Sequence, residues 1–222
     1  MNTSLIKIEN VTKKYKNKYV LKNISLDITH PGIYGFSGPN GSGKSMTFKT
    51  ILGFVRPSSG KVTVNGEIIR KETLFAHDIG FSMSEFGVLA NKSGTENLEL
   101  LSILAKQGSE SIPTLLRYVG LDPEDDKKVS SYSLGMKQRL SIATALIGNH
   151  KILILDEPTN ALDEDGQAFL KKLVLDLFEK GKTILISSHD STFLRSVAHQ
   201  IYFLNDGKIV KEELVWNSSI YG

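Results

Sequence analysis

A glycine-rich segment has the residue types and spacing of a phosphate-binding loop. It reads Gly38-Pro39-Asn40-Gly41-Ser42-Gly43-Lys44-Ser45. Every position fits the pattern G-x-x-x-x-G-K-[ST], in which backbone N–H groups and the start of the next helix surround phosphate oxygens. Lys44 would reach the β- and γ-phosphates, and the Ser45 hydroxyl would bind Mg²⁺. We include Met46, the next residue, in the expected nucleotide site, although the pattern does not identify the nucleotide or the reaction.

Two carboxylates follow a short apolar strand at residues 152–155. A buried strand would bring Asp156 to the carboxyl edge of a sheet, beside the phosphate loop, where it can hold Mg²⁺ through water. Glu157 points elsewhere and could polarise an attacking water as a general base. Alone, such a pair is an ordinary acidic turn. Together with the phosphate loop it favours a metal-dependent hydrolase.

The composition places the chain among ordinary globular proteins. Apolar residues make up 40% of its 222 residues and charged residues 23%. The net charge of +3 comes from 27 basic and 24 acidic residues with no basic block, so we expect no nucleic-acid partner. The absence of cysteine excludes disulfides, thiolate metal sites and cysteine nucleophiles, and it fits a reducing cytoplasm.

The order of apolar segments predicts an α/β fold with a mostly parallel sheet. Compact strands are expected at residues 33–37, 151–155, 183–187 and 200–204, with helical patterns between them, beginning with residues 44–52. Alternating strands at residues 5–11 and 24–28 and a hairpin at residues 61–69 predict an antiparallel β subdomain.

We expect one domain, 1–222, with two parts. Residues 1–84 and 132–222 would form a catalytic core with the β subdomain. Helical spacing at residues 96–106 and 112–119 predicts that about residues 85–131 form an inserted α-helical subdomain. The N-terminus lacks the pattern of a signal peptide, and no apolar run approaches the roughly 20 residues of a spanning helix. We therefore expect a chain that does not cross a membrane by itself.

Four further segments give the chain its resemblance to a known family. Residues 132–140, Tyr-Ser-Leu-Gly-Met-Lys-Gln-Arg-Leu, resemble the signature motif of ABC ATPases, usually L-S-G-G-Q followed by Q-R. Residues 156–163 resemble the family's second acidic motif running into its D-loop. His189 is similar to the switch histidine, and Tyr15 to the aromatic residue that stacks on adenine. The resemblance extends over nearly the whole chain, with the motifs in the family's order.

The resemblance implies a RecA-like P-loop NTPase that binds ATP and Mg²⁺ and hydrolyses ATP with Lys44, Glu157 and His189. Ser133 and the backbone at Gly135 would bind the γ-phosphate of ATP held by the opposite subunit. Asp163 would lie at the interface between the two subunits. The family implies two partners, a second ATPase subunit (homodimer or heterodimer) and a transmembrane permease on a separate chain. It also implies a cytoplasmic location, peripheral on the inner face of the cell membrane.

The chain departs from the family pattern at three positions. Leu134 replaces a glycine and Met136 a glutamine of the signature, in a form that resembles the drug-, lantibiotic- and bacitracin-resistance branch, which implies export of a drug, peptide or antibiotic. Ser84 stands where the family has the Gln or Glu that contacts Mg²⁺. Ser84 could contact the metal at short reach or through water, or Glu85 could take the place of the usual Gln or Glu. Alternatively, the position tolerates different residues, and Ser45, Asp156 and waters suffice to hold the metal. We expect slower hydrolysis than is usual in the family.

Two other functions remain as alternatives. A non-transport ABC ATPase acting on DNA or ribosomes would have a long coiled coil or a duplicated ATPase unit, and the sequence has neither. A P-loop kinase would transfer phosphate to a small acceptor. The signature-like helix and the carboxylate of Glu157 argue against it, because a hydrolase needs a group that activates water.

Overall fold

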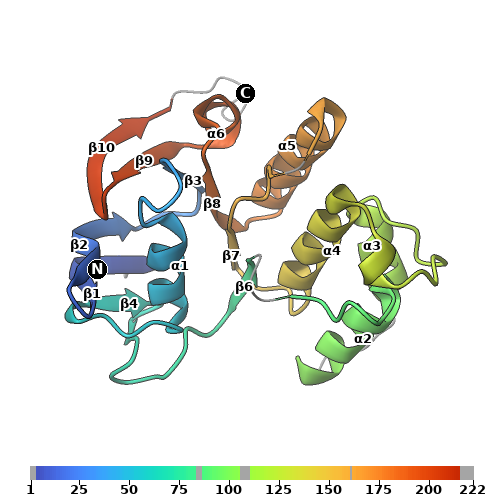
Figure 1. Ribbon diagram of the computed structural model, residues 1–222, viewed down its shortest axis with the longest axis horizontal. Helices are drawn as coiled ribbons and strands as arrows, with labels where there is room; N and C mark the ends of the chain where they lie inside the picture. The colour runs from blue at the N-terminus through green and yellow to red at the C-terminus, as the bar shows by residue number, and fades with distance from the viewer. Residues whose placement is uncertain (1–3, 84–86, 106–110, 161, 216–222) are drawn as a thin grey trace.

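The computed structural model describes residues 4–83, 87–105, 111–160 and 162–215. Figure 1 shows most of the strands on one side of the molecule and the helices α2, α3 and α4 grouped on the other. Strands β6 and β7 lie between the two groups. The mixed α/β fold expected from the sequence is confirmed.

The larger sheet has six strands in the order β10-β9-β3-β8-β7-β6. Its strands are β3 (Ile33–Ser37), β6 (Ile79–Ser82), β7 (Ile152–Leu155), β8 (Thr183–Ser188), β9 (Gln200–Asn205) and β10 (Lys208–Leu214). All neighbouring pairs are parallel except β9 and β10, which form an antiparallel hairpin. The carboxyl ends of β3, β7 and β8 therefore meet at one edge, where open α/β sheets hold their ligands.

The smaller sheet is antiparallel and has four strands in the order β2-β1-β4-β5. Its strands are β1 (Ile6–Tyr15), β2 (Lys18–Ile28), β4 (Ser59–Val64) and β5 (Glu67–Ile68). The predicted strands overlap these elements, although Leu5 and Ile69 at the ends of the predicted segments lie just outside them, and β1 and β2 continue to a tight turn at residues 16–17. This extension brings the start of β2 close to the phosphate loop.

Some of the helices pack beside the sheets, whereas α2, α3 and α4 form a separate helical part of the molecule (Figure 1). They are α1 (Lys44–Leu52), α2 (Gly94–Leu104), α3 (Ile112–Tyr118), α4 (Leu134–Leu146), α5 (Glu164–Glu179) and α6 (Ser191–Val197). A short 3₁₀ turn, Val129–Ser131, precedes α4. Ser93 starts α2 with a capping box, in which its hydroxyl accepts from the Glu96 N–H while the Glu96 carboxylate accepts from the Ser93 N–H.

The central strands are buried on both faces, which explains their nearly continuous apolar sequences. On β7, Leu153 and Leu155 face the apolar cluster beneath the helices, whereas Ile152 and Ile154 face the cluster between the two sheets. None of the helices in the described ranges combines the length and apolar composition that a bilayer-spanning helix needs.

Helix α4 packs closely against β6 at Gly80. A Cβ atom on Gly80 would lie 1.9 Å from the carbonyl oxygen of Ala145, which is far inside van der Waals contact. The contact joins the helical part to the edge of the central sheet, and it requires a residue without a side chain.

We predict that Gly80→Ala lowers the free energy of unfolding by about 1–3 kcal/mol, because the backbone of α4 must move to admit the methyl group. Chemical denaturation measures this loss. Gly87→Ala is the matched control, since a Cβ there meets no atom of the described residues within 4 Å. Equal stability of the two variants would contradict the close contact.

Candidate functional site

The phosphate-loop segment connects β3 to α1, as its sequence predicts. Gly38 leaves β3 beside the end of β9, and a Cβ there would lie 2.2 Å from the Leu204 carbonyl oxygen. Gly43 precedes α1 at φ 112°, in the region that favours glycine. The Ser42 carbonyl accepts from the Gly207 N–H at 2.9 Å, so the loop is fixed to the β9–β10 hairpin.

The loop has free capacity for an anion. No side chain caps the N-terminus of α1, whereas Ser133 caps α4, Asp163 caps α5 and Asp190 caps α6. The first N–H groups of α1 therefore lack the usual side-chain acceptor. Among the described residues, the buried Ser42 hydroxyl also has no hydrogen-bond partner. Phosphate oxygens would satisfy both sets of donors.

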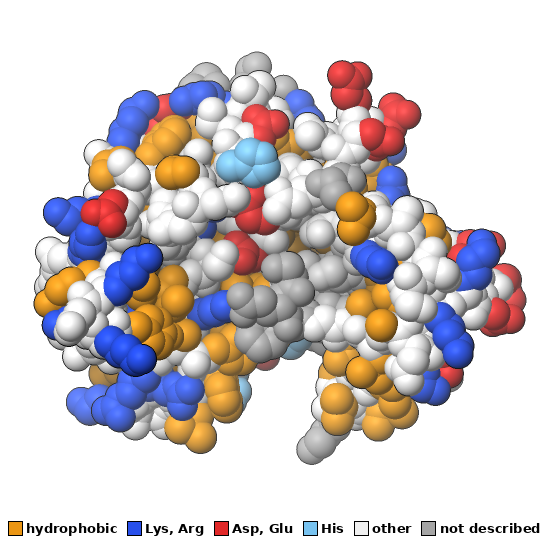
Figure 2. Space-filling model, viewed as in Figure 1, with side chains coloured by type: hydrophobic (Ala, Val, Ile, Leu, Met, Phe, Trp, Pro, Cys, Tyr) orange, Lys and Arg blue, Asp and Glu red, His pale blue; other side chains and the backbone are white. Residues whose placement is uncertain are grey.

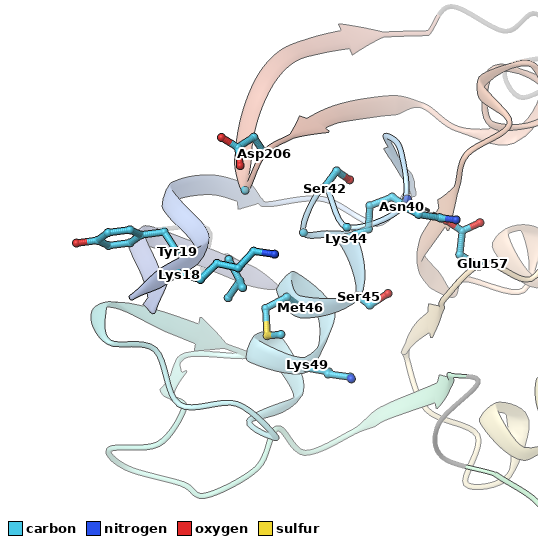
Figure 3. A pocket seen from close by; sticks show the side chains of 14 residues that line it. Lys18, Tyr19, Asn40, Ser42, Lys44, Ser45, Met46, Lys49, Glu157 and Asp206 are labelled. Carbon is cyan, nitrogen blue, oxygen red and sulfur yellow. Dashed lines mark ion pairs between the residues drawn. The ribbon is translucent and has the colours of Figure 1, made fainter. Parts of the chain in front are cut away.

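Lys44 places a buried ammonium group beneath the loop. Only 5% of its side chain is exposed. It donates to the carbonyls of Gly38 at 2.5 Å and Pro39 at 3.3 Å, and its Nζ lies 3.0 Å from Oε1 of Glu157. Figure 3 shows the Lys44 and Glu157 side chains meeting from the two sides of the site.

The acidic pair and His189 stand at the same sheet edge. Leu155 of β7 pairs with Ile186 of β8, so Asp156 and Glu157 emerge close to the end of β8. The Nδ1 atom of His189 lies 3.2 Å from Oε2 of Glu157. Glu157 thus contacts Lys44 with one oxygen and His189 with the other, and the structure brings these three predicted residues together.

A cavity of about 440 Å³ opens over the phosphate loop, as Figure 3 shows. Besides residues 40–46 and Glu157, it is lined by Lys18 and Lys49. Three ammonium groups therefore surround a space whose acidic lining residues are Glu157 and Asp206, and Asp206 is paired with Lys22 at 2.5 Å. This excess of positive charge suits a polyphosphate. The sequence contained no signal for Lys18 or Lys49, because both are ordinary lysines without a motif.

Tyr15 lies apart from this cavity. It is half-exposed at the end of β1, with the Lys13 ammonium 4.6 Å from its ring centroid, and it does not line the cavity. Tyr19 of β2 does line it, although its ring points away from the loop in Figure 3. Stacking of Tyr15 on a base remains a prediction.

A second cavity, of about 430 Å³, brings Ser133, Gly135 and Asp163 together. Ser133 accepts from the Met136 N–H at 3.1 Å and starts α4 as predicted, whereas anion binding at this helix end stays a prediction. Asp163 caps α5 by accepting from the Gly166 N–H at 2.8 Å. Leu134, at a departure from the family pattern, exposes 67% of its surface here. The two cavities share no lining residue.

The donors for a metal ion are oxygen atoms. The Ser45 hydroxyl lines the first cavity and the Asp156 carboxylate, 8% exposed, lies at the adjacent strand end. No group of three or more His, Cys, Asp or Glu in the described ranges could hold a metal alone. A hard ion bound by few protein oxygens and by substrate phosphates, as Mg²⁺ is, fits this set. Ser84 and Glu85 lie outside the described residues, so their predicted part is untested.

Comparisons with known proteins identify the family. The sequence model of the ABC transporter family matches residues 21–160. The chain is 38% identical over 212 residues to the uncharacterized ABC transporter ATP-binding protein YybJ of Bacillus subtilis, covering 95% of this chain and 97% of YybJ. It is 36% identical over 209 residues to the lantibiotic transport ATP-binding protein SrtF of Streptococcus pyogenes, covering 94% and 90%.

A solved structure agrees with these matches. The dimeric ATP-binding cassette MJ0796, in a post-hydrolysis state bound to ADP and Pi, superposes with a TM-score of 0.86 at 29% identity. The alignment covers 96% of this chain and 99% of that one. The chain therefore belongs to the ABC transporter family, and its fold is that of an ATP-binding cassette.

We predict that Lys44→Ala weakens nucleotide binding by about tenfold or more, because a hydrogen bond to a charged group contributes about 1.5–3 kcal/mol. Titration with a fluorescent ATP analogue measures the dissociation constant. Lys61→Ala removes the same charge from the smaller sheet, where the Lys61 ammonium pairs with Glu9 at 3.0 Å. This control variant should leave nucleotide binding unchanged. Equal dissociation constants of the two variants for the ATP analogue would show that Lys44 does not contribute to nucleotide binding.

Proposed function

We propose that this chain is the ATP-hydrolysing subunit of an ABC exporter and acts on a separate transmembrane permease. The observation that carries the proposal is the meeting of Lys44, Glu157 and His189 at one sheet edge, below a cavity with excess positive charge. ATP would lie in this cavity with its phosphates on the loop. Ser45 and Asp156 would hold Mg²⁺, which neutralises phosphate charge when bound.

The residues divide the hydrolysis between them. Glu157 would accept a proton from the water whose oxygen attacks the γ-phosphorus. The bond from that phosphorus to the β–γ bridging oxygen breaks, and its electron pair leaves with ADP. Lys44 would stabilise the β- and γ-phosphate oxygens, and His189 would hydrogen-bond the γ-phosphate. When ATP binds, the Lys44 ammonium would leave the Glu157 carboxylate and pair with phosphate oxygens instead. The Glu157 carboxylate would then be available to the attacking water.

A complete site would need two copies. Ser133, Gly135 and Asp163 face a cavity separate from the phosphate loop, and α4 stands across the molecule from α1 in Figure 1. One nucleotide would contact both sets of residues if the loop of one subunit faces the α4 start of another. The dimeric state of MJ0796 supports this arrangement.

The proposed permease would dock beside α2. Leu100, Ile103 and Leu104 are exposed on that helix, Ile103 by 70%. A cavity of about 440 Å³ between β6 and α4 adjoins it and includes Phe81 and Leu101. Figure 2 shows hydrophobic side chains on both sides of the notch at the lower edge of this face. Such an apolar patch is typical of a protein-binding site.

The relatives support a proposal for the cargo and the location. SrtF is named for lantibiotic transport, and this supports export of a peptide antibiotic or similar compound by the present chain and its permease. Docking on a permease would hold the chain at the cytoplasmic face of the cell membrane.

We predict that Glu157→Gln retains ATP binding, loses nearly all turnover and accumulates as an ATP-bound dimer, because the amide cannot accept the proton from water. Light scattering after size exclusion, with and without ATP, measures the mass. Glu179→Gln, at the exposed end of α5, should behave as wild type. Turnover by Glu157→Gln at the wild-type rate would show that Glu157 is not the base.

We predict that Ile103→Glu abolishes co-purification of the permease from solubilised membranes, since it places a charge in the apolar patch, while basal hydrolysis stays unchanged. Mass spectrometry identifies the retained membrane protein. Glu99→Gln on the same helix is the control. Retention of a polytopic membrane protein by Ile103→Glu at the wild-type level would argue against this docking site.

A further inference from the structure

We propose that Ser187 is a positioning residue that fixes both acidic residues of the site through one hydroxyl group. Its Oγ donates to Oδ1 of Asp156 at 2.6 Å and accepts from the backbone N–H of Glu157 at 2.8 Å. The inference rests on the proposed roles of Asp156 in metal binding and Glu157 as base. No motif in the sequence pointed to this residue.

The sheet determines why this serine can reach both groups. The last pair of the β7–β8 ladder is Leu155 and Ile186, so Asp156 and Ser187 are the next residues on adjacent parallel strands. Ser187 is fully buried, with an exposed fraction of 0%. Its hydroxyl therefore has no access to water and is committed to these two partners.

Glu157 needs this contact because of its backbone conformation. Its φ is 51°, in the left-handed region that is unfavourable for a non-glycine residue. The conformation turns the chain away from the β7 direction, and the Glu157 carboxylate then reaches Lys44 and His189. A buried N–H without an acceptor would add a further cost, and the Ser187 hydroxyl is its acceptor.

The same hydroxyl orients Asp156. A serine hydroxyl has one proton, and here the Oδ1 atom of Asp156 receives it. The other carboxylate oxygen is then available for the metal. Partners that hold metal-binding carboxylates in this way typically contribute tenfold or more to affinity or activity.

Ser188 provides a control within the same strand. It is also 0% exposed, and its hydroxyl bonds to the Thr159 hydroxyl at 2.8 Å and accepts from the Asp190 N–H at 3.0 Å. Among the described residues, its hydroxyl makes no hydrogen bond to Asp156 or Glu157, so its removal costs a buried hydroxyl but leaves the acidic pair in place.

The test compares Ser187→Ala with Ser188→Ala in the full chain. We expect Ser187→Ala to lower kcat by about tenfold to a hundredfold and to weaken Mn²⁺ binding in the presence of ADP, measured by electron paramagnetic resonance, by about tenfold. Amide hydrogen exchange at Glu157, measured without nucleotide, should become faster. Ser188→Ala should leave all three near wild type, and Ser187→Thr, which keeps the hydroxyl, should restore them.

Wild-type values in Ser187→Ala, or equal losses in Ser188→Ala, would overturn the proposal. If Ser187→Ala does not fold, Ser187→Cys replaces it, because the thiol is a weak donor and the same losses are expected. A wild-type chain without ATP hydrolysis would refute the proposed function instead. Mn²⁺ affinity and Glu157 exchange would still decide the role of Ser187.

Discussion

The buried ammonium of Lys44 is the constraint on which the site depends. A charge that is 95% removed from water needs acceptors and a counter-charge. The carbonyls of Gly38 and Pro39 come from the loop that leaves β3, and the Glu157 carboxylate comes from the end of β7. These contacts require β3, β8 and β7 to lie side by side in parallel, which the observed strand order provides.

This arrangement also connects substrate binding to catalysis. Without nucleotide, Glu157 neutralises Lys44 and contacts His189. Phosphate oxygens would replace Glu157 as the partner of Lys44, so the proposed base becomes available only when the substrate is present. The left-handed backbone at Glu157 and the Ser187 hydroxyl hold the carboxylate where this exchange is possible. The unfavourable φ of Glu157 therefore serves the proposed function, because it places the carboxylate beside Lys44 and His189.

The features that local chemistry determines could be predicted from the sequence. The bounds of β3 and α1 followed from an apolar run, a glycine-rich loop and a terminal glycine, and Ser133 was recognised as a helix start. Contacts between distant segments could not be found in this way. Lys18 reaches the cavity only because β1 and β2 extend to a tight turn, and Ser187 meets Asp156 only through the β7–β8 register. Tyr15 was assigned from its place in the order of motifs; it does not line the cavity among the described residues, and its stacking on a base stays a prediction.

We propose that ATP is hydrolysed at a site completed by two copies of this chain. Release of inorganic phosphate from ATP and Mg²⁺, measured over a wide range of protein concentration, tests it most directly. We expect the rate per chain to rise with concentration and then to reach a plateau as the dimer forms. A rate per chain that is independent of concentration while the protein is monomeric, or no phosphate release at any concentration, would contradict it.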